Sequence, residues 1–237
     1  MILIYDFDGT LTPYSMPQYD ILVKAGYDEE KFMSLVKKNV LLTNKSLYEV
    51  YYDTYRDILS KSNINFNRSN VCLGAKEVVF NEGVLEYFSF LQKNNSYLKH
   101  YVVTCGIKDY VEETKIFPYL EGVYGTTFNE KNGLFENLDF LMSDDNKVLA
   151  IKEILRKNKE DKVIYFGDGL TDEKAFSFVK SIGGITVFVS KDKNADDNLK
   201  KLQAKKIIDY SFDCDFSKGK ELFEFVKNLQ WMKKMTL

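Results

Sequence analysis

The chain has 237 residues, of which 45% are hydrophobic and 29% charged, and its formal net charge is −2. This length suits one large domain or a core domain with a smaller second one. The scattered basic residues form no electrostatic surface for nucleic acid, so we expect no nucleic-acid partner. No apolar run approaches the roughly 18 residues of a membrane span, so we expect no membrane association.

The cysteines and the histidine limit the chemistry further. Cys72, Cys105 and Cys214 are far apart and lack the spacing of metal ligands. They are typical of reduced thiols, and with a strand predicted from residue 2 we expect no signal peptide and a cytoplasmic protein. The single histidine, His100, stands at a predicted strand start, where we expect it to be solvated. Zinc sites with several histidines are therefore excluded.

The first predicted element is the apolar run at residues 2–5, which is hydrophobic on both faces. Such a run predicts a buried central strand, as in a parallel sheet. It leads directly into Asp6-Phe7-Asp8-Gly9-Thr10. Pro13 and Pro17 follow and indicate an irregular connector.

A helical pattern extends from about residue 17 to residue 80. Asp28 opens one helix, and Ser46 with Glu49 forms a capping-box pattern that opens another. We interpret residues 14–80 as a small helical domain. It would be inserted into a core made of residues 1–13 and 81–237.

Four tyrosines share one face of the helix that Ser46 opens, since their spacing is i, i+3, i+4 and i+7: Tyr48, Tyr51, Tyr52 and Tyr55. We favour packing inside the helical domain as their role, with substrate contact as the alternative. Arg56 lies on the same helix. It is a candidate for binding a substrate carboxylate or a second phosphate, and a surface ion pair with Asp53 or Glu49 is the alternative.

Beyond residue 80, helices and strands alternate. The predicted elements are a helix at 82–94, a strand at 101–104, a helix ending near Phe117, a hairpin at 123–138 around Asn132-Gly133, a helix from 144–146 to 158, a strand at 162–166, a helix at 172–179, a strand at 185–189, a helix at 196–203, a strand at 207–208 and a helix at 220–228. This alternation predicts an α/β fold with a doubly wound, mainly parallel, Rossmann-like sheet.

Three of the predicted strands end in polar motifs: Asp6-x-Asp8-Gly9-Thr10, Thr104-Cys105-Gly106 and Gly167-Asp168-Gly169-x-x-Asp172. In a parallel sheet these strand ends lie at one edge. Carboxylate oxygens suit Mg²⁺, and glycine-rich turns bind phosphate oxygens. A carboxylate can also act as a nucleophile and form an aspartyl-phosphate. The sequence therefore predicts a site for a magnesium-bound phosphate.

These motifs, with Lys147 in the first turn of a helix between the last two, resemble the four motifs of the haloacid dehalogenase superfamily of phosphatases. The helical insertion after the first motif, and the hairpin before the helix of Lys147, resemble the phosphoserine-phosphatase-like branch with a helical type-1 cap. The resemblance implies a phosphatase that uses Mg²⁺ and acts on a small phosphorylated metabolite.

The resemblance also implies residue roles. Asp6 would be the nucleophile and a Mg²⁺ ligand. Asp8 would protonate the leaving alcohol and then activate water, while its backbone carbonyl binds Mg²⁺. Thr104 would hold the phosphoryl oxygens together with the nearby backbone N–H groups of Cys105 and Gly106.

The other two motifs would complete the site. Lys147 would neutralise charge between Asp6 and the phosphate, and we favour it over Lys152 because a lysine in a first helical turn opposes the helix dipole. Asp168 would bind Mg²⁺, with Asp172 either a ligand or an anchor for the ligands. Cys105 is interpreted as a small buried filler and not as a nucleophile.

Three functions remain open on the sequence. The first is a phosphatase; the second is a phosphomutase or phosphotransferase of the same fold; the third is a silent module that binds Mg²⁺ and phosphate. Phosphoserine phosphatases place an acidic residue soon after the first motif to bind the substrate amine. Here the first acid after Asp8 is Asp20, and this departure argues against phosphoserine as the substrate.

Overall fold

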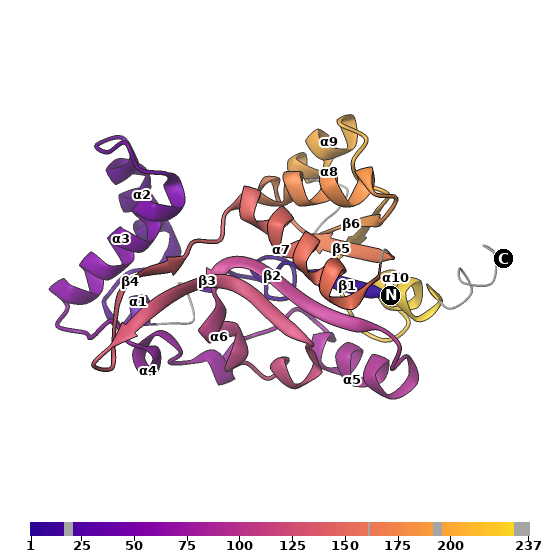
Figure 1. Cartoon of the computed structure of the whole chain (residues 1–237), viewed down its shortest axis with the longest axis horizontal. Helices are drawn as coiled ribbons and strands as arrows, with labels where there is room; N and C mark the ends of the chain where they lie inside the picture. Colours follow the sequence, from indigo (N-terminus) through magenta and orange to yellow (C-terminus); the bar gives the residue numbers. More distant parts are fainter. Residues whose placement is uncertain (17–20, 161, 192–195, 230–237) are drawn as a thin grey trace.

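The computed structural model of the protein describes residues 1–16, 21–160, 162–191 and 196–229. A seven-stranded sheet with the order β4-β3-β2-β1-β5-β6-β7 forms the centre of the molecule (Figure 1). The strands are β1 (Ile2–Tyr5), β2 (Lys99–Ile107), β3 (Gly122–Lys131), β4 (Leu134–Phe140), β5 (Val163–Gly167), β6 (Ile185–Ser190) and β7 (Tyr210–Asp213). All neighbouring strands are parallel except β3 and β4, which form an antiparallel hairpin. The predicted α/β fold class is confirmed.

Strand β1 lies in the middle of the sheet because it can be buried on both faces. All four of its residues are buried. It pairs with β2 on one side and β5 on the other, and Ile4 is in register with Tyr101 and with Tyr165. The parallel register brings the carboxyl ends of these three strands to one edge, where the polar motifs follow.

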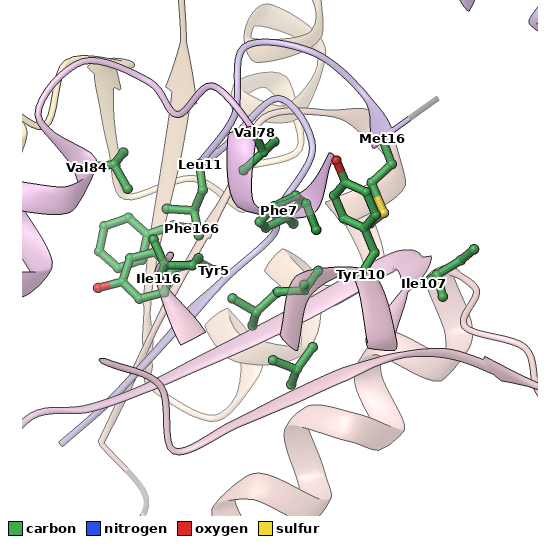
Figure 2. Close-up of a cluster of buried hydrophobic side chains, with 14 of the residues drawn as sticks. Tyr5, Phe7, Leu11, Met16, Val78, Val84, Ile107, Tyr110, Ile116 and Phe166 are labelled. Atoms are coloured by element: carbon green, nitrogen blue, oxygen red, sulfur yellow. The ribbon is translucent and has the colours of Figure 1, made fainter. Parts of the chain in front are cut away.

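Helices cover both faces of the sheet (Figure 1). One face carries α7 (Asp144–Asn158), α8 (Glu173–Ser181) and α9 (Asp197–Ala204), and the other carries α5 (Val84–Asn94), α6 (Lys108–Glu112) and α10 (Glu221–Lys227). The side chains of β1 alternate between two cores, with Ile2 and Ile4 in one and Leu3 and Tyr5 in the other. Figure 2 shows part of the second core, where Tyr5 and Phe7 pack with side chains of the connector that follows β1.

The chain between β1 and α5 is helical, as the pattern predicts. It contains α1 (Ile21–Lys24), α2 (Glu29–Val40), α3 (Leu47–Lys61), α4 (Arg68–Val71) and the short 3₁₀ turn Ala75–Glu77. Asp28 caps α2, and the capping box of Ser46 and Glu49 at α3 is confirmed. Pro17 lies outside the described residues.

Helices α2 and α3 lie at one end of the molecule, where the β3–β4 hairpin extends to meet them (Figure 1). Aromatic rings make this contact. Phe66 packs on Phe128 and Phe135 of the hairpin with ring centroids 4.9 and 5.3 Å apart, and Tyr52 of α3 packs on Phe128 at 5.4 Å. The backbone N–H of Phe135 also donates to the carbonyl of Phe66 at 2.8 Å. The hairpin thus supports the helical insertion.

Several predicted boundaries are wrong. Strand β2 continues to Ile107, so Cys105 and Gly106 lie inside the strand and not in a turn after it. A register shift between Val103 and Ile107 accommodates them. Helix α6 ends at Glu112, well before Pro118, because the hydroxyl and N–H of the nearby Thr114 both bond to the Val111 carbonyl.

Two further predictions fail at the ends of elements. The last strand is at Tyr210–Asp213, whereas the predicted 207–208 segment packs against the core that contains α8 and α9. The N-cap of α7 was predicted within residues 144–146, but it is Ser143, whose hydroxyl accepts from the Asn146 N–H at 3.4 Å. Within the described residues, no helix has the length and apolar character needed to cross a membrane.

His100 is buried rather than solvated, with 5% of its surface exposed. Its Nδ1 lies 3.1 Å from the Tyr5 hydroxyl, and its ring contacts the rings of Tyr5 and Phe88 at 6.0 and 5.3 Å. Burial lowers the pKa of His100 from 6.5 to about 4. The strand-start pattern does not reveal this burial, because α5 supplies the cover from a distant part of the sequence.

Candidate active site

Asp6, Lys147 and Asp172 form a buried ionic group at the carboxyl edge of the sheet. The ammonium Nζ of Lys147 lies 3.1 Å from Asp6 Oδ2 and 2.7 Å from Asp172 Oδ1. The backbone N–H of Phe7 donates to Asp6 Oδ1 at 2.8 Å and orients that carboxylate. All three ionic side chains are nearly excluded from solvent, with exposures of 1%, 8% and 0% for Lys147, Asp6 and Asp172.

Asp168 completes this group from the end of β5. Its Oδ1 accepts from the Thr10 hydroxyl at 3.0 Å. The approach of Asp168 to the first motif needs Gly9, which has a φ of +80° and where a Cβ would lie 2.1 Å from Asp168 Oδ2. Glycine thus satisfies both the left-handed backbone and the close contact.

Asp172 is the most fully bonded of the carboxylates. Its Oδ1 accepts from Lys147 and from the Tyr165 hydroxyl at 2.6 Å. Its Oδ2 accepts from the backbone N–H groups of Asp168 and Gly169 at 3.2 and 3.3 Å. These bonds occupy both oxygens, so Asp172 holds the last motif and Lys147 in place. This arrangement fits the anchoring role better than the role of a metal ligand.

The charges of this ionic group favour the binding of a cation. Burial raises the pKa of Asp6 to about 7, although Lys147 opposes the rise. Burial also raises the pKa of Asp168 well above its ordinary value, and the negative charges of Asp172 and Asp6 add to the effect. Burial lowers the pKa of Lys147, but Asp172 and Asp6 outweigh it and keep the ammonium charged.

A divalent cation would offset the excess of negative charge in this group. Oxygens of Asp6, Asp168 and Asp172 lie within 4.8 Å of one another. Three carboxylates facing one ammonium carry an excess of negative charge, which is costly in a buried place. An all-oxygen donor set suits hard ions such as Mg²⁺. The residues present therefore fit the predicted metal.

The second motif lies on the neighbouring strand. Thr104 is fully buried, and its Oγ1 accepts from the Gly106 N–H at 2.9 Å. A Cβ on Gly106 would lie 1.9 Å from the Met16 methyl carbon and 3.2 Å from Thr104 Oγ1, so only glycine fits beneath Met16 without a shift. Burial raises the pKa of the Cys105 thiol to about 12, so this thiol is no ready nucleophile.

Asp8 lines a cavity of about 150 Å³ between the sheet edge and α3. Its Oδ1 is buried and has no hydrogen-bond partner in the described part of the chain. Burial raises the pKa of Asp8 well above its ordinary value, and the charge of Asp6 adds to the rise. A protonated Asp8 carboxyl is thus favoured. The cavity wall includes Cys105, Gly106 and all four tyrosines of the predicted face: Tyr48, Tyr51, Tyr52 and Tyr55.

Two of these tyrosines join α3 to the core. The Tyr52 hydroxyl donates to the Cys105 carbonyl at 2.7 Å, and the Tyr48 hydroxyl donates to Asp144 at the start of α7. Tyr52 and Tyr55 are buried and contact rings of neighbouring segments, as the packing interpretation expects. The same side chains thus take part in packing and in the cavity wall, and substrate contact stays a prediction.

Comparison with known sequences agrees with this geometry. A sequence model of the family described as haloacid dehalogenase-like hydrolase matches residues 3–177, which is most of the chain. The chain belongs to this family. The predicted superfamily is thus confirmed.

Relatives of this hydrolase extend over nearly its whole length. An uncharacterized protein of Borreliella burgdorferi is 25% identical, and the match covers 94% of each chain. A crystal structure of a hydrolase of this family from Salmonella enterica serovar Typhi has a TM-score of 0.65 at 11% identity, covering 90% of this chain and 68% of the other. A substrate-bound phosphoserine phosphatase has a TM-score of 0.62 at 18% identity, covering 95% and 96% of the two chains. At such identities the two solved structures establish a shared fold.

Two basic residues of this haloacid dehalogenase-like hydrolase lie away from the ionic group. Lys152 Nζ lies 5.1 Å from the centre of the Phe178 ring, so Lys147 is the lysine that reaches Asp6. The guanidinium carbon of Arg56 lies 5.8 Å from the centre of the Phe66 ring. Among the described residues, Arg56 is not part of the wall beside Asp8. Of the two partners in the alternative interpretation, Asp53 pairs with Lys45 and Glu49 bonds to Ser46.

Sequence reasoning missed some supporting residues of this hydrolase. Tyr165 bonds to Asp172, and Thr10 bonds to Asp168, yet neither received a role. A tyrosine in an otherwise apolar buried strand was the available signal for Tyr165, because a buried phenol needs a hydrogen-bond partner. Ser15 and Met16 also line the cavity, and no sequence pattern marks them.

Proposed function

We propose that this chain is a Mg²⁺-dependent phosphatase that hydrolyses a small phosphomonoester through an aspartyl-phosphate on Asp6. One observation carries the proposal: Asp6 is held by Lys147 inside a carboxylate cluster, while Asp8 faces a cavity two residues further along. A nucleophile and an acid two residues apart suit attack at phosphorus on one side and protonation of the leaving oxygen on the other. The solved phosphatases of the same fold agree with this proposal.

The chemistry divides between the two aspartates. In the first step, an Asp6 carboxylate oxygen attacks phosphorus, the bond from phosphorus to the ester oxygen breaks, and the protonated Asp8 carboxyl gives its proton to that oxygen. In the second step, Asp8 takes a proton from water, and the resulting hydroxide attacks phosphorus. The bond between phosphorus and Asp6 then breaks, which releases inorganic phosphate and restores both carboxyl groups. The raised pKa of Asp8 supports its role as the acid in the first step.

The remaining residues hold and neutralise the reacting group. Asp6, Asp168 and the Asp8 backbone carbonyl would hold Mg²⁺, which supplies positive charge to the phosphoryl oxygens when bound. Asp172 would position Lys147 and the Asp168 loop through its four hydrogen bonds. Lys147 would offset the charge of Asp6 and the phosphate, and Thr104 would hold a phosphoryl oxygen.

We further propose that residues 14–80 form a cap domain, with residues 1–13 and 81–237 as the core. The bonds of Tyr48 and Tyr52 to the core support a closed arrangement in which this cap covers the site. The free thiols of Cys72, Cys105 and Cys214 support the expected cytoplasmic location.

Hydrolysis of p-nitrophenyl phosphate tests the proposal. We expect activity with Mg²⁺, loss of activity with EDTA and recovery on adding Mg²⁺ back. Asp6→Asn should lower kcat by at least about 10³-fold, because it removes the nucleophile. Asp57→Asn is a matched control on the exposed surface of α3, where Asp57 pairs only with Lys61 among the described residues. Equal rates for the wild type, the EDTA-treated protein and Asp6→Asn would contradict the proposal.

The products separate hydrolysis from transfer. Release of one inorganic phosphate per ester consumed supports a phosphatase, whereas a phosphotransferase would convert a second alcohol to its phosphate ester. A silent binding module would show neither reaction.

A further inference from the structure

We propose that the alcohol part of the substrate is uncharged and carries a single apolar or aromatic ring, which lies in the cavity beside Asp8. This inference rests on the proposed function, because it takes Asp8 as the group that faces the leaving oxygen. The part of an ester beyond that oxygen would then enter the cavity that opens there. The chemistry of the cavity wall therefore selects the alcohol.

The wall is mainly aromatic and apolar. Its large side chains are Tyr48, Tyr51, Tyr52 and Tyr55 of α3, with Met16 and Ile107 from the core. The rings of Tyr51 and Tyr52 contact each other edge to face at 5.1 Å, and other rings support them from behind. Figure 2 shows Met16 and Ile107 with Tyr110 at one end of the buried cluster. Such a wall binds a flat or apolar body through surface burial and ring contacts.

The described residues of the wall offer little opposite charge to a charged alcohol. Among the described residues that line the cavity, Asp8 is the only one of the Asp, Glu, Lys, Arg and His types. The Tyr48 and Tyr52 hydroxyls already donate to Asp144 and to the Cys105 carbonyl. Burial keeps the Cys105 thiol neutral by raising its pKa to about 12. A carboxylate placed here would be desolvated without an opposite charge, and an ammonium would face only Asp8, which the proposed reaction uses as its acid; both placements are unfavourable. The alcohol part of phosphoserine carries both an ammonium and a carboxylate, so this wall disfavours phosphoserine.

Two polar atoms of the wall are still unsatisfied. Asp8 Oδ1 and Ser15 Oγ are both buried and have no hydrogen-bond partner among the described residues, and both residues line the cavity. Buried polar groups without partners are costly, so a ligand that supplies them gains affinity. The leaving oxygen would bond to Asp8, and one further neutral polar atom on the alcohol would bond to Ser15.

The size of the cavity limits the alcohol to one ring. Its volume is about 150 Å³. An engineered apolar cavity of about 150 Å³ in another protein stays free of water and binds benzene. A bicyclic body or a long chain would not fit without movement of α3.

Phosphate esters of primary alcohols that differ in charge test whether the cavity selects an uncharged alcohol. The panel is benzyl phosphate, phosphoserine, O-phosphoethanolamine and phosphoglycolate, assayed with Mg²⁺ and with p-nitrophenyl phosphate as a reference. We expect kcat/KM for benzyl phosphate to exceed that of each charged ester by at least about tenfold, which is the scale of discrimination in apolar pockets. Equal or faster turnover of a charged ester, with p-nitrophenyl phosphate still hydrolysed in an Asp6-dependent reaction, would overturn this inference alone. Loss of every reaction would refute the proposed function instead.

Two variants examine the wall itself. Met16→Lys places a cation in the cavity and should raise the ratio of phosphoglycolate to benzyl phosphate turnover by about tenfold or more. Leu42→Lys adds the same charge on the exposed surface, where Leu42 is 74% exposed, and should leave the ratio unchanged. Asp20 is the first acidic residue after Asp8 and lies outside the described residues, so Asp20→Asn tests whether its charge contributes to substrate selection. The order of preference should persist in Asp20→Asn, and a preference that changes would contradict an uncharged alcohol.

Discussion

The buried His100 makes a quantitative prediction about stability and pH. The native pKa of His100 is about 4, against an ordinary value of 6.5, so the folded state holds this ring neutral while the unfolded chain can protonate it. The contribution of His100 is therefore complete above pH 6.5 and is lost as the pH falls towards 4. The gap between the two values corresponds to about 3 kcal/mol, of which about 2 kcal/mol is lost by pH 5.

His100→Phe isolates this effect. Phenylalanine cannot titrate and suits a position between the rings of Tyr5 and Phe88, while the Tyr5 hydroxyl keeps its contact with the Tyr87 hydroxyl at 2.9 Å. We expect the variant to lose about 1 kcal/mol at neutral pH, the typical contribution of one hydrogen bond. Between pH 7 and pH 5 the wild type should lose about 2 kcal/mol more than the variant.

Urea unfolding followed by circular dichroism at both pH values measures this difference. Asp6, Asp8 and Asp168 have raised pKa values and so favour folding as the pH falls, but subtraction of the variant removes their contribution. Val102→Ala is a control for lowered stability, since Val102 is buried on the same strand and cannot titrate. If wild type and His100→Phe respond to pH alike within about 0.5 kcal/mol, then His100 is not held neutral by burial and the reasoning is wrong.

Three predictions concern the ionic group. Lys147→Met leaves buried carboxylates unpaired, so it should lower the free energy of unfolding in urea by about 3–5 kcal/mol and abolish phosphatase activity. Lys152→Met should lower the free energy of unfolding by less than about 1 kcal/mol. Similar losses in the two variants would contradict Lys147 as the lysine that pairs with Asp6. Mg²⁺ at about 100 times its Kd should stabilise the wild type by about 2.7 kcal/mol in thermal melts, and Asp168→Asn should remove most of this gain; an unchanged gain would exclude Asp168 as a ligand. Gly9→Ala should lower the free energy of unfolding clearly more than Gly183→Ala, because both positions have a positive φ but only a Cβ at Gly9 would collide with the Asp168 carboxylate. Equal losses of stability would show that this collision does not occur.

The sequence by itself determined the architecture and the residues of the ionic group. The apolar run at residues 2–5 and the alternation of strand and helix patterns are local signals, since side-chain periodicity depends on neighbours a few residues away. The strand-end positions of Asp6 and Asp168 then placed them at one edge, because parallel strands share their carboxyl ends. Cap signals such as Ser46 with Glu49 are equally local.

Only the tertiary structure decided which of these side chains meet and what covers them. Lys147 and Lys152 lie on the same helix, and their distances to Asp6 depend on how α7 packs on the sheet. Arg56 and the tyrosines share α3, yet Arg56 lies over Phe66 while the tyrosines wall the cavity beside Asp8. Distant segments of the chain supply most of the neighbours that bury a side chain. A local sequence pattern therefore does not reveal how deeply that side chain is buried. The sequence therefore predicted which residues lie at the sheet edge, and the packing of α3 against the sheet formed the cavity beside Asp8.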